Sequence, residues 1–229
     1  MIVLALDTSA VTAAAALTDG ETLIAQASLD GAKTHSETLL PMVAQMCELS
    51  HITPDDVDLY ACSVGPGSFT GIRIGVSVLK GLAFGRNKPC VALSALDVLA
   101  ENLCGTPDTL ICPVMDARRG HFYNALYLNG EKQTPDRLIS ADDLHAELLQ
   151  RQLPVCLLGD GAAALSVLWK NESFLRPVPP LLIRPNGYAA ALCALKMFGR
   201  NTGVCTDASL APVYLRPTQA ERELQEKNG

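Results

Sequence analysis

The feature that most limits the fold is an internal repeat of one strand-turn-strand pattern. The first copy, IVLALDTSAVTAAAALTDGETLI, contains an apolar strand ending at Asp7, a polar turn, a second strand of small residues and a hairpin turn at Asp19-Gly20. The second copy, ICPVMDARRGHFYNALYLNGEKQ, follows the same plan, with Asp116 and a hairpin turn at Asn129-Gly130. The repeat predicts two copies of a hairpin-led α/β unit. The alternative is a coincidence between two ordinary hairpins.

The two copies lie about half the chain apart and indicate how the 229 residues are divided. The segment Gly105-Thr106-Pro107-Asp108 has the composition of a connection between them. We therefore expect an N-terminal lobe over residues 1–105, carrying the helices discussed below, and a smaller C-terminal lobe over residues 106–229. The last helix of the second lobe could pack back on the first.

Composition excludes several classes of protein. The chain is 48% hydrophobic, but no uninterrupted apolar run is long enough to cross a membrane, and the start MIVLALDTSA lacks the basic region of a signal peptide, so we expect a cytoplasmic protein. Its net charge is −6 and its longest basic run is Arg118-Arg119, which does not favour a nucleic-acid grip by this chain alone. The eight cysteines form no C-x-x-C pair and are interpreted as reduced core thiols.

The stretch SVGPGSFTGIRIGVSVLKG is typical of a strand, a glycine turn and a helix. A phosphate-binding loop is one interpretation, but the glycines do not follow G-x-G-x-x-G and no Gly-Lys-Ser/Thr ends the turn. We interpret it as a packing device, because glycines four residues apart, Gly71 with Gly75 and Gly81 with Gly85, would let a neighbouring helix approach closely. The residues of this predicted glycine turn are Gly65, Pro66, Gly67, Ser68, Thr70 and Gly71.

Two predicted helices have apolar arcs wider than contact with one core requires. They are THSETLLPMVAQMCELS and the helix after the glycine turn, where Arg73, Ser77 and Lys80 form a single narrow polar stripe. One such helix would favour a buried core position, whereas two neighbours in the same half favour an interface between subunits. The residues predicted at this protein interface are Ser36, Leu39, Leu40, Val43, Met46, Cys47, Arg73, Ile74, Ser77, Val78 and Gly81.

These segments, together with LALDTS, THSETLLP, MDARRGHFYNALY and APVYLRP, resemble the bacterial TsaB (YeaZ) family over nearly the whole chain. The resemblance implies a duplicated actin/Hsp70/sugar-kinase-like (ribonuclease-H-like) α/β fold. It also implies a non-catalytic scaffold that acts with the paralogous enzyme TsaD and the ATPase TsaE. Their reaction transfers threonylcarbamoyl to adenosine 37 of tRNAs that read codons beginning with A. By the same resemblance the chain pairs with TsaD through its first-lobe helices, forms a homodimer when alone, and meets tRNA only in the complex.

The resemblance also separates this chain from the catalytic paralog, whose H-x-x-x-H motif binds a metal. Ala95 and Leu99 stand at those two ligand positions here, and neither can coordinate a metal. The four histidines form no pair with short ligand spacing. The alternatives left open are a stand-alone, metal-dependent glycoprotease-like hydrolase (M22 type) and an ATP-dependent group transferase. One departure from the family is His121, which stands where an acidic residue is usual and leaves the role of that carboxylate in doubt.

Two aspartates and two glycine positions could be the remnant of a nucleotide site. Asp7 and Asp116 resemble the paired acids that hold Mg²⁺ and position phosphates in ATP-using members of this fold, although an aspartate at a strand end can simply cap a turn. The residues of this vestigial nucleotide site are Asp7, Thr8, Ser9, Asp116, Gly159 and Gly161. We expect no cofactor to be held by this chain alone, and ATP or ADP only at an interface with TsaD and TsaE.

Overall fold

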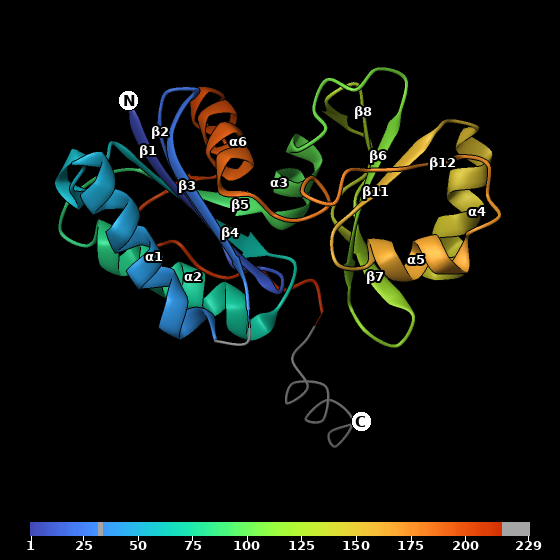
Figure 1. Ribbon diagram of the computed structural model, residues 1–229, viewed down its shortest axis with the longest axis horizontal. Helices are drawn as coiled ribbons and strands as arrows, with labels where there is room; N and C mark the ends of the chain where they lie inside the picture. Colours follow the sequence, from blue (N-terminus) through green and yellow to red (C-terminus); the bar gives the residue numbers. More distant parts are fainter. Residues whose placement is uncertain (32–33, 217–229) are drawn as a thin grey trace.

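Two mixed β-sheets with the same strand plan form the centre of the molecule (Figure 1). The computed structural model describes residues 1–31 and 34–216. The first half of the chain forms β1 (Ile2–Asp7), β2 (Thr12–Asp19), β3 (Thr22–Asp30), α1 (His35–Ser50), the 3-10 turn η1 (Pro54–Asp56), β4 (Leu59–Gly65), α2 (Phe69–Ala83), β5 (Cys90–Ser94) and α3 (Ala95–Glu101). The second half forms β6 (Leu110–Asp116), β7 (His121–Asn124), β8 (Tyr127–Leu128), β9 (Glu131–Lys132), β10 (Arg137–Ser140), α4 (Ala141–Arg151), β11 (Val155–Leu158), α5 (Ala162–Leu168), β12 (Leu175–Arg176), α6 (Gly187–Gly199) and β13 (Val204–Cys205).

The predicted duplication is confirmed by the order and direction of the strands. In the first sheet β3, β2 and β1 are antiparallel neighbours, and β4 and β5 continue parallel to β1. In the second sheet β10, β7 and β6 repeat the antiparallel part, and β11 and β12 repeat the parallel part. Asp7 and Asp116 therefore end corresponding central strands, β1 and β6.

One detail of the predicted repeat is wrong. The turn at Asn129-Gly130 does not correspond to Asp19-Gly20, which joins β2 to β3. It joins the short strands β8 and β9, which pair beside the start of β6, and the counterpart of β3 is the later strand β10. The sequence motif was an ordinary hairpin signal, and it marked an insertion between the second and third strands of the unit.

The apolar strand β1 has two buried faces because helices cover both sides of its sheet. Leu4 and Leu6 pack with α1 and α2, whereas Val3 and Ala5, one position out of phase, pack with α6. Figure 1 shows α1 and α2 on one face of the first sheet and α6 on the other. A strand buried on both faces needs apolar residues at every position, which explains why IVLAL shows no polar alternation.

The last helix of each unit packs against the sheet of the other unit. Helix α3 ends the first unit, yet Ala95, Leu96 and Leu99 join a cluster with β6 and β11 of the second sheet. Helix α6 ends the second unit, yet its alanines pack on β1 and β4, and β13 then pairs antiparallel with β5. This exchange places α3 and α6 together between the sheets (Figure 1). We call the part around the first sheet the first lobe and the part around the second sheet the second lobe.

Two expectations from composition can be compared with the described residues. No helix among them is long and apolar enough to span a membrane. All eight cysteines are free, and five of them are buried. Cys104 is an exception to the expectation of core thiols, because it is exposed in the turn that follows α3.

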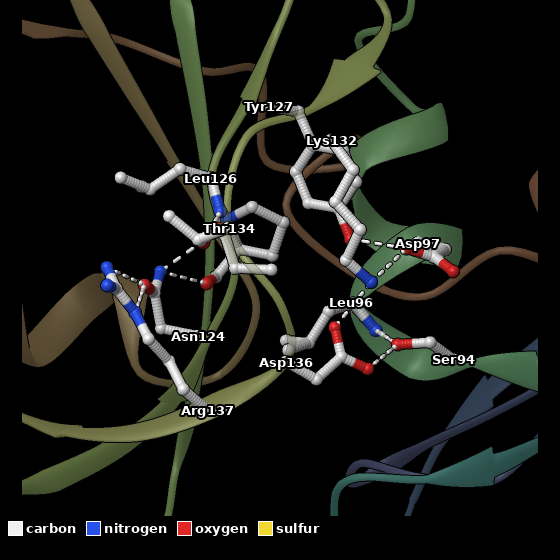
Figure 2. Close-up of polar contacts among 12 residues, drawn as sticks. Ser94, Leu96, Asp97, Asn124, Leu126, Tyr127, Lys132, Thr134, Asp136 and Arg137 are labelled. Carbon is white, nitrogen blue, oxygen red and sulfur yellow. Dashed lines mark hydrogen bonds and ion pairs between the residues drawn. The ribbon is translucent and has the colours of Figure 1, made fainter.

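A polar network joins α3 to the β8–β10 segment across the lobe boundary (Figure 2). Lys132 Nζ lies 2.7 Å from Asp97 Oδ1 and 2.6 Å from Asp136 Oδ1. The Tyr127 hydroxyl donates to Asp97 over 2.5 Å, and the Ser94 hydroxyl donates to Asp136 over 2.6 Å. Burial lowers the pKa of Lys132, but its bonds to Asp136 and Asp97 outweigh that effect and leave the pKa above its ordinary value. The cation therefore stays charged and holds both carboxylates.

We predict that Lys132→Met lowers the free energy of unfolding by about 1–3 kcal/mol, because two partly buried carboxylates lose their shared cation. Urea denaturation followed by circular dichroism measures the change. The matched control is Lys170→Met, which removes an exposed lysine that forms no ion pair with the described residues and should change stability little. Equal effects of the two substitutions would show that the network contributes nothing specific.

Candidate functional site: the cleft between the lobes and the outer face of the first two helices

A cleft of about 1310 Å³ lies between the two lobes. Its first-lobe wall is formed by the β1–β2 turn and the start of α2, and its second-lobe wall by the ends of β6 and β11. This is the carboxyl edge of the parallel strands, where open α/β sheets bind ligands. The acidic and basic side chains that line the cleft are those of Arg73, Asp116, Arg118, Asp160 and Arg216, and His35 lies beside them.

The glycine turn between β4 and α2 lies directly on the backbone of the β1–β2 turn. Ser68 N–H donates to Ser9 O over 2.7 Å, and the Thr8 hydroxyl donates to Gly71 O over 2.8 Å. A Cβ atom on Gly67, whose φ is +149°, would lie 2.3 Å from Ser9 O, and a Cβ on Gly71 would lie 2.1 Å from Thr8 O. Only glycine permits this approach of two backbones.

The sequence predicted that a neighbouring helix would pack against the glycines of the α2 region, and this prediction is wrong. Gly71 and Gly75 do not receive a neighbouring helix but the β1–β2 turn, since a Cβ on Gly75 would lie 2.3 Å from the Thr8 hydroxyl. At Gly81 and Gly85, no described residue beyond the chain neighbours and the helix's own backbone comes within 4 Å of the Cβ position. Ser68 caps α2 by accepting from Gly71 N–H over 3.2 Å. The spacing indicated close contact correctly at Gly71 and Gly75 but not at Gly81 and Gly85, and it could not identify the element that makes the contact.

We predict that Gly71→Ala destabilises the protein by about 1–3 kcal/mol, because the methyl group would overlap the Thr8 carbonyl. The matched control, Gly81→Ala, lies on the same helix in open space and should stabilise it by about 0.5–1 kcal/mol. Thermal unfolding followed by circular dichroism gives both values. Two changes of the same sign would contradict the packing described for α2.

Asp7 is fully buried and its carboxylate is already occupied by protein groups. Oδ1 accepts from Ser9 N–H over 2.9 Å and from the Ser9 hydroxyl over 2.7 Å. Oδ2 accepts from the Ser63 hydroxyl, at the end of β4, over 2.5 Å. Burial raises the pKa of Asp7, and the bonds from Ser63 and Ser9 oppose that shift. The side chain is 0% exposed and does not line the cleft.

Asp116, its counterpart in the second lobe, lies in a different environment. It is exposed and lines the cleft, where Oδ1 accepts from Arg118 N–H over 2.7 Å. Its own N–H donates to Asp160 Oδ1 over 2.9 Å. Desolvation of the carboxyl raises the pKa of Asp160, helped by the nearby charge of Asp116 and opposed by that backbone bond. The second lobe therefore presents two adjacent carboxyl groups to the cleft.

The other residues of the predicted nucleotide remnant do not assemble into one site. Ser9 lines the cleft, but Thr8 is buried beneath α2. Gly159 and Gly161 are buried against β6 and β7, since their Cβ atoms would lie 2.3 Å from Val114 O and 2.7 Å from the Phe122 ring. Asp7 itself is fully buried and does not reach the cleft. The first-lobe residues therefore do not fit a nucleotide bound in the cleft through Asp7.

We predict that the free energy of unfolding of Asp7→Asn, compared with that of the wild type, increases as pH rises above 3.8. The pKa of Asp7 is raised in the folded state, so above pH 3.8 the unfolded chain releases the proton first. The contribution of Asp7 to wild-type stability therefore falls as pH rises, until the pH exceeds the raised pKa of Asp7 in the folded state. Urea unfolding of both proteins between pH 3 and 8 tests this, and a difference in stability that is constant with pH would contradict it.

The predicted interface on α1 and α2 divides into core and surface residues. Leu39, Val43 and Met46 are 0%, 1% and 5% exposed and belong to the core beneath α1, so their predicted place at a partner surface is wrong. They face β2 and β3. The sheet therefore packs against the apolar face of α1 that we predicted would bind a partner. The predicted residues left on the surface are Ser36, Leu40, Arg73, Ser77 and Gly81, with Cys47, Ile74 and Val78 half-buried.

An apolar groove of about 580 Å³ remains open on the outer side of these helices. Its floor and sides include Leu40, Ala44 and Cys47 of α1 and Leu82 of α2. Leu40 is 49% exposed. An exposed leucine beside a groove of this kind is typical of a surface that another protein covers. Whether a partner binds there stays a prediction.

The positions that matched the metal ligands of the catalytic paralog are closed. Ala95 and Leu99 are both 0% exposed and pack against the second sheet. No group of three or more histidine, cysteine or acidic side chains lies close enough to hold a metal among the residues that the structure describes. His35 bonds the backbone of the first hairpin, with Nε2 2.9 Å from Ala10 O, and His121 is exposed.

The sequence pattern missed several residues that shape the cleft. Ser63, which holds Asp7, looks like the end of an apolar strand, and Asp160 lies inside a turn that was interpreted through its glycines. Tyr214 and Arg216 also line the cleft, where Arg216 bonds Ala117 of the second-lobe wall, 99 residues earlier in the chain. Tyr214 and Arg216 both belong to the segment APVYLRP, whose local sequence pattern does not indicate that it lines the cleft.

The duplicated sheets with exchanged helices and a cleft between them define a two-lobed, actin-like protein. In agreement, the activator of 2-hydroxyisocaproyl-CoA dehydratase from Clostridium difficile, with bound ADPNP, superposes with a TM-score of 0.52 at 12% identity, covering 88% of this chain and 97% of its own. A Pseudomonas aeruginosa protein described as similar to the peptidase YEAZ superposes with a TM-score of 0.72 at 25% identity, covering 94% and 99%.

The sequence comparisons narrow this class to one family. A family model described as TsaD, tRNA N6-adenosine threonylcarbamoyltransferase, matches residues 28–196. The tRNA threonylcarbamoyladenosine biosynthesis protein TsaB of Bacillus subtilis (strain 168) is 33% identical over 96% of both chains. The protein of the same name from Escherichia coli (strain K12) is 28% identical over 99% of this chain and 100% of its own. The chain belongs to the TsaB family.

Proposed function

We propose that this protein acts in tRNA threonylcarbamoyladenosine biosynthesis as a non-catalytic subunit. The names of its relatives support the pathway, and the TsaD-type family model supports a paralogous transferase as its partner. In this proposal TsaD carries out the transfer of threonylcarbamoyl to adenosine 37, TsaE joins as a third component, and this chain supports TsaD by binding it.

The observation that carries the non-catalytic part is the burial of Asp7 and of the two positions that match the paralog's metal ligands, Ala95 and Leu99. The Asp7 carboxyl is already bonded by Ser9 and Ser63. Ala95 and Leu99 fill, with apolar side chains, the place where the paralog is expected to hold its metal. A group that touches neither solvent nor cleft cannot contact a substrate, so the chemistry is assigned to the partner. Any ATP or ADP is assigned to a shared surface with TsaD and TsaE.

Reconstitution tests this function directly. Given tRNA, threonine, bicarbonate, ATP and the enzyme that makes threonylcarbamoyl-adenylate, we expect this protein to yield no modified adenosine until TsaD is added. With TsaE also present, omission of this chain should reduce modification to background. Mass spectrometry of digested tRNA measures the product. Modification by this chain without TsaD would overturn the non-catalytic assignment.

The groove on α1 and α2 is the surface proposed for TsaD, and for a second copy of this chain when TsaD is absent. Leu40, which is 49% exposed, lines the groove. The lining consists of one side of α1, residues 51–54 that follow it and Leu82 of α2, a mainly apolar surface on which a partner helix could lie. If the same face also meets itself, symmetry gives a two-fold homodimer.

We predict that Leu40→Asp weakens TsaD binding at least about tenfold, because a carboxylate would be desolvated in the groove. The fold should remain intact, since Leu40 is exposed in the free chain. Leu49→Asp is the matched control: it lies on the same helix, is 75% exposed and does not line the groove. Affinity is measured by calorimetry and self-association by light scattering. Equal weakening by both variants, or by neither, would remove the groove from the interface.

A further inference from the structure

Residues 206–216, here called the strap, follow the exposed side of α2 and end at the second lobe. The strap begins after β13 and inserts Leu210, 1% exposed, into the core beneath α2. Lys80 of α2 fixes this part, because its Nζ donates to Ala208 O and to Leu210 O, both over 3.1 Å. The strap therefore starts as an anchored part of the first lobe.

The middle of the strap covers the outer side of the glycine turn. Val213 N–H donates to Val64 O over 2.8 Å, and a Cβ on Gly65 would lie 2.2 Å from Val213 O. The Tyr214 ring stacks on Phe69, with ring centroids 4.7 Å apart. Arg73 completes this contact, since its Nε donates to the Tyr214 hydroxyl over 2.8 Å. The β1–β2 turn lies on one side of the glycine turn, and the strap lies on the other.

The end of the strap crosses the mouth of the cleft. Arg216 Nη1 donates to Ala117 O, in the β6–β7 turn of the second lobe, over 2.6 Å. That turn is tight, with positive φ at Arg118, Arg119 and Gly120. Residues 213–216 all line the cleft. One hydrogen bond from Arg216 thus ties the glycine turn of the first lobe to the rim of the second.

Two of the contacts between the lobes, at α3 and at the strap, differ in strength. At α3 they share a buried apolar cluster and the Lys132 network (Figure 2). At the cleft mouth the strap contributes partly exposed residues, with Val213 at 53% and Tyr214 at 38% exposure and Arg216 half-buried. Exposed contacts of this kind open at lower free energy than a buried cluster. Any relative movement of the lobes should therefore pivot at α3 and open at the strap.

We propose that the strap is a releasable clamp across the cleft. When Tyr214 and Arg216 are in place, the strap holds the glycine turn and the β6–β7 turn together. When they detach, the cleft opens and Arg73 on the outer face of α2 is freed. The clamp thus links the state of the cleft to the surface of α2, and this inference does not depend on the proposed function.

Hydrogen exchange of the full chain, read by mass spectrometry, tests the clamp. The Ser68 amide reports the glycine turn through its bond to Ser9 O, and the Ala117 amide reports the β6–β7 turn through its bond to His121 O. Arg216→Ala should speed exchange in peptides covering both turns by about tenfold or more, the effect of losing a charge-assisted hydrogen bond. Exchange in α6 should stay unchanged.

Two further variants separate a clamp from a simple loss of stability. Tyr214→Phe removes only the hydroxyl that accepts from Arg73, keeps the ring stacked on Phe69, and should speed exchange in the glycine turn. Arg200→Ala removes an exposed arginine with no side-chain hydrogen bond to the described residues and should change neither turn. Unchanged exchange in Arg216→Ala would overturn the clamp. Faster exchange throughout the chain, α6 included, would also overturn it, because the strap would then be part of the cooperative fold.

Discussion

The arrangement of the first lobe around the cleft depends on the contact between the glycine turn and the β1–β2 turn. Two backbones meet there without side chains between them, so Ser68 N–H reaches Ser9 O and the Thr8 hydroxyl reaches Gly71 O. The same contact fixes the start of α2 and forms one wall of the cleft. Each of these features would change if a side chain separated the two turns.

The duplicated architecture makes the difference between the two lobes informative. Asp7 and Asp116 end corresponding strands, yet one is buried in a closed hydrogen-bond network and the other faces the cleft beside Asp160. A carboxylate without solvent and with all its neighbours already bonded has no free coordination site. An Asp7 that is buried and bonded in this way is consistent with the proposed supporting role, in which the partner supplies the chemistry.

Three surfaces meet on helix α2. Its inner face lies on β4 and the first hairpin, one edge borders the α1 groove proposed for a partner, and Arg73 and Lys80 bind the strap. Two of the three residues of the polar stripe, Arg73 and Lys80, are thus bonded by a segment more than 120 residues later in the sequence. A rigid helix that touches all three can transmit a change at one surface to another, provided that one of the contacts can open.

The sequence alone determined the local requirements: two hairpin-led units, strands buried on both faces, a turn that accepts only glycine, and no histidine pair at Ala95 and Leu99. These follow from periodicity and residue chemistry, which act over a few neighbouring residues. Tertiary structure decided what covers each face. Val43 and Leu40 belong to the same apolar arc, but the sheet buries the first and leaves the second exposed. Asp7 was recognisable as a strand end, but its burial depends on Ser63, and the cleft mouth depends on Arg216. Such contacts join residues far apart in the chain, so periodicity shows which side chains share a face but not which element lies against it.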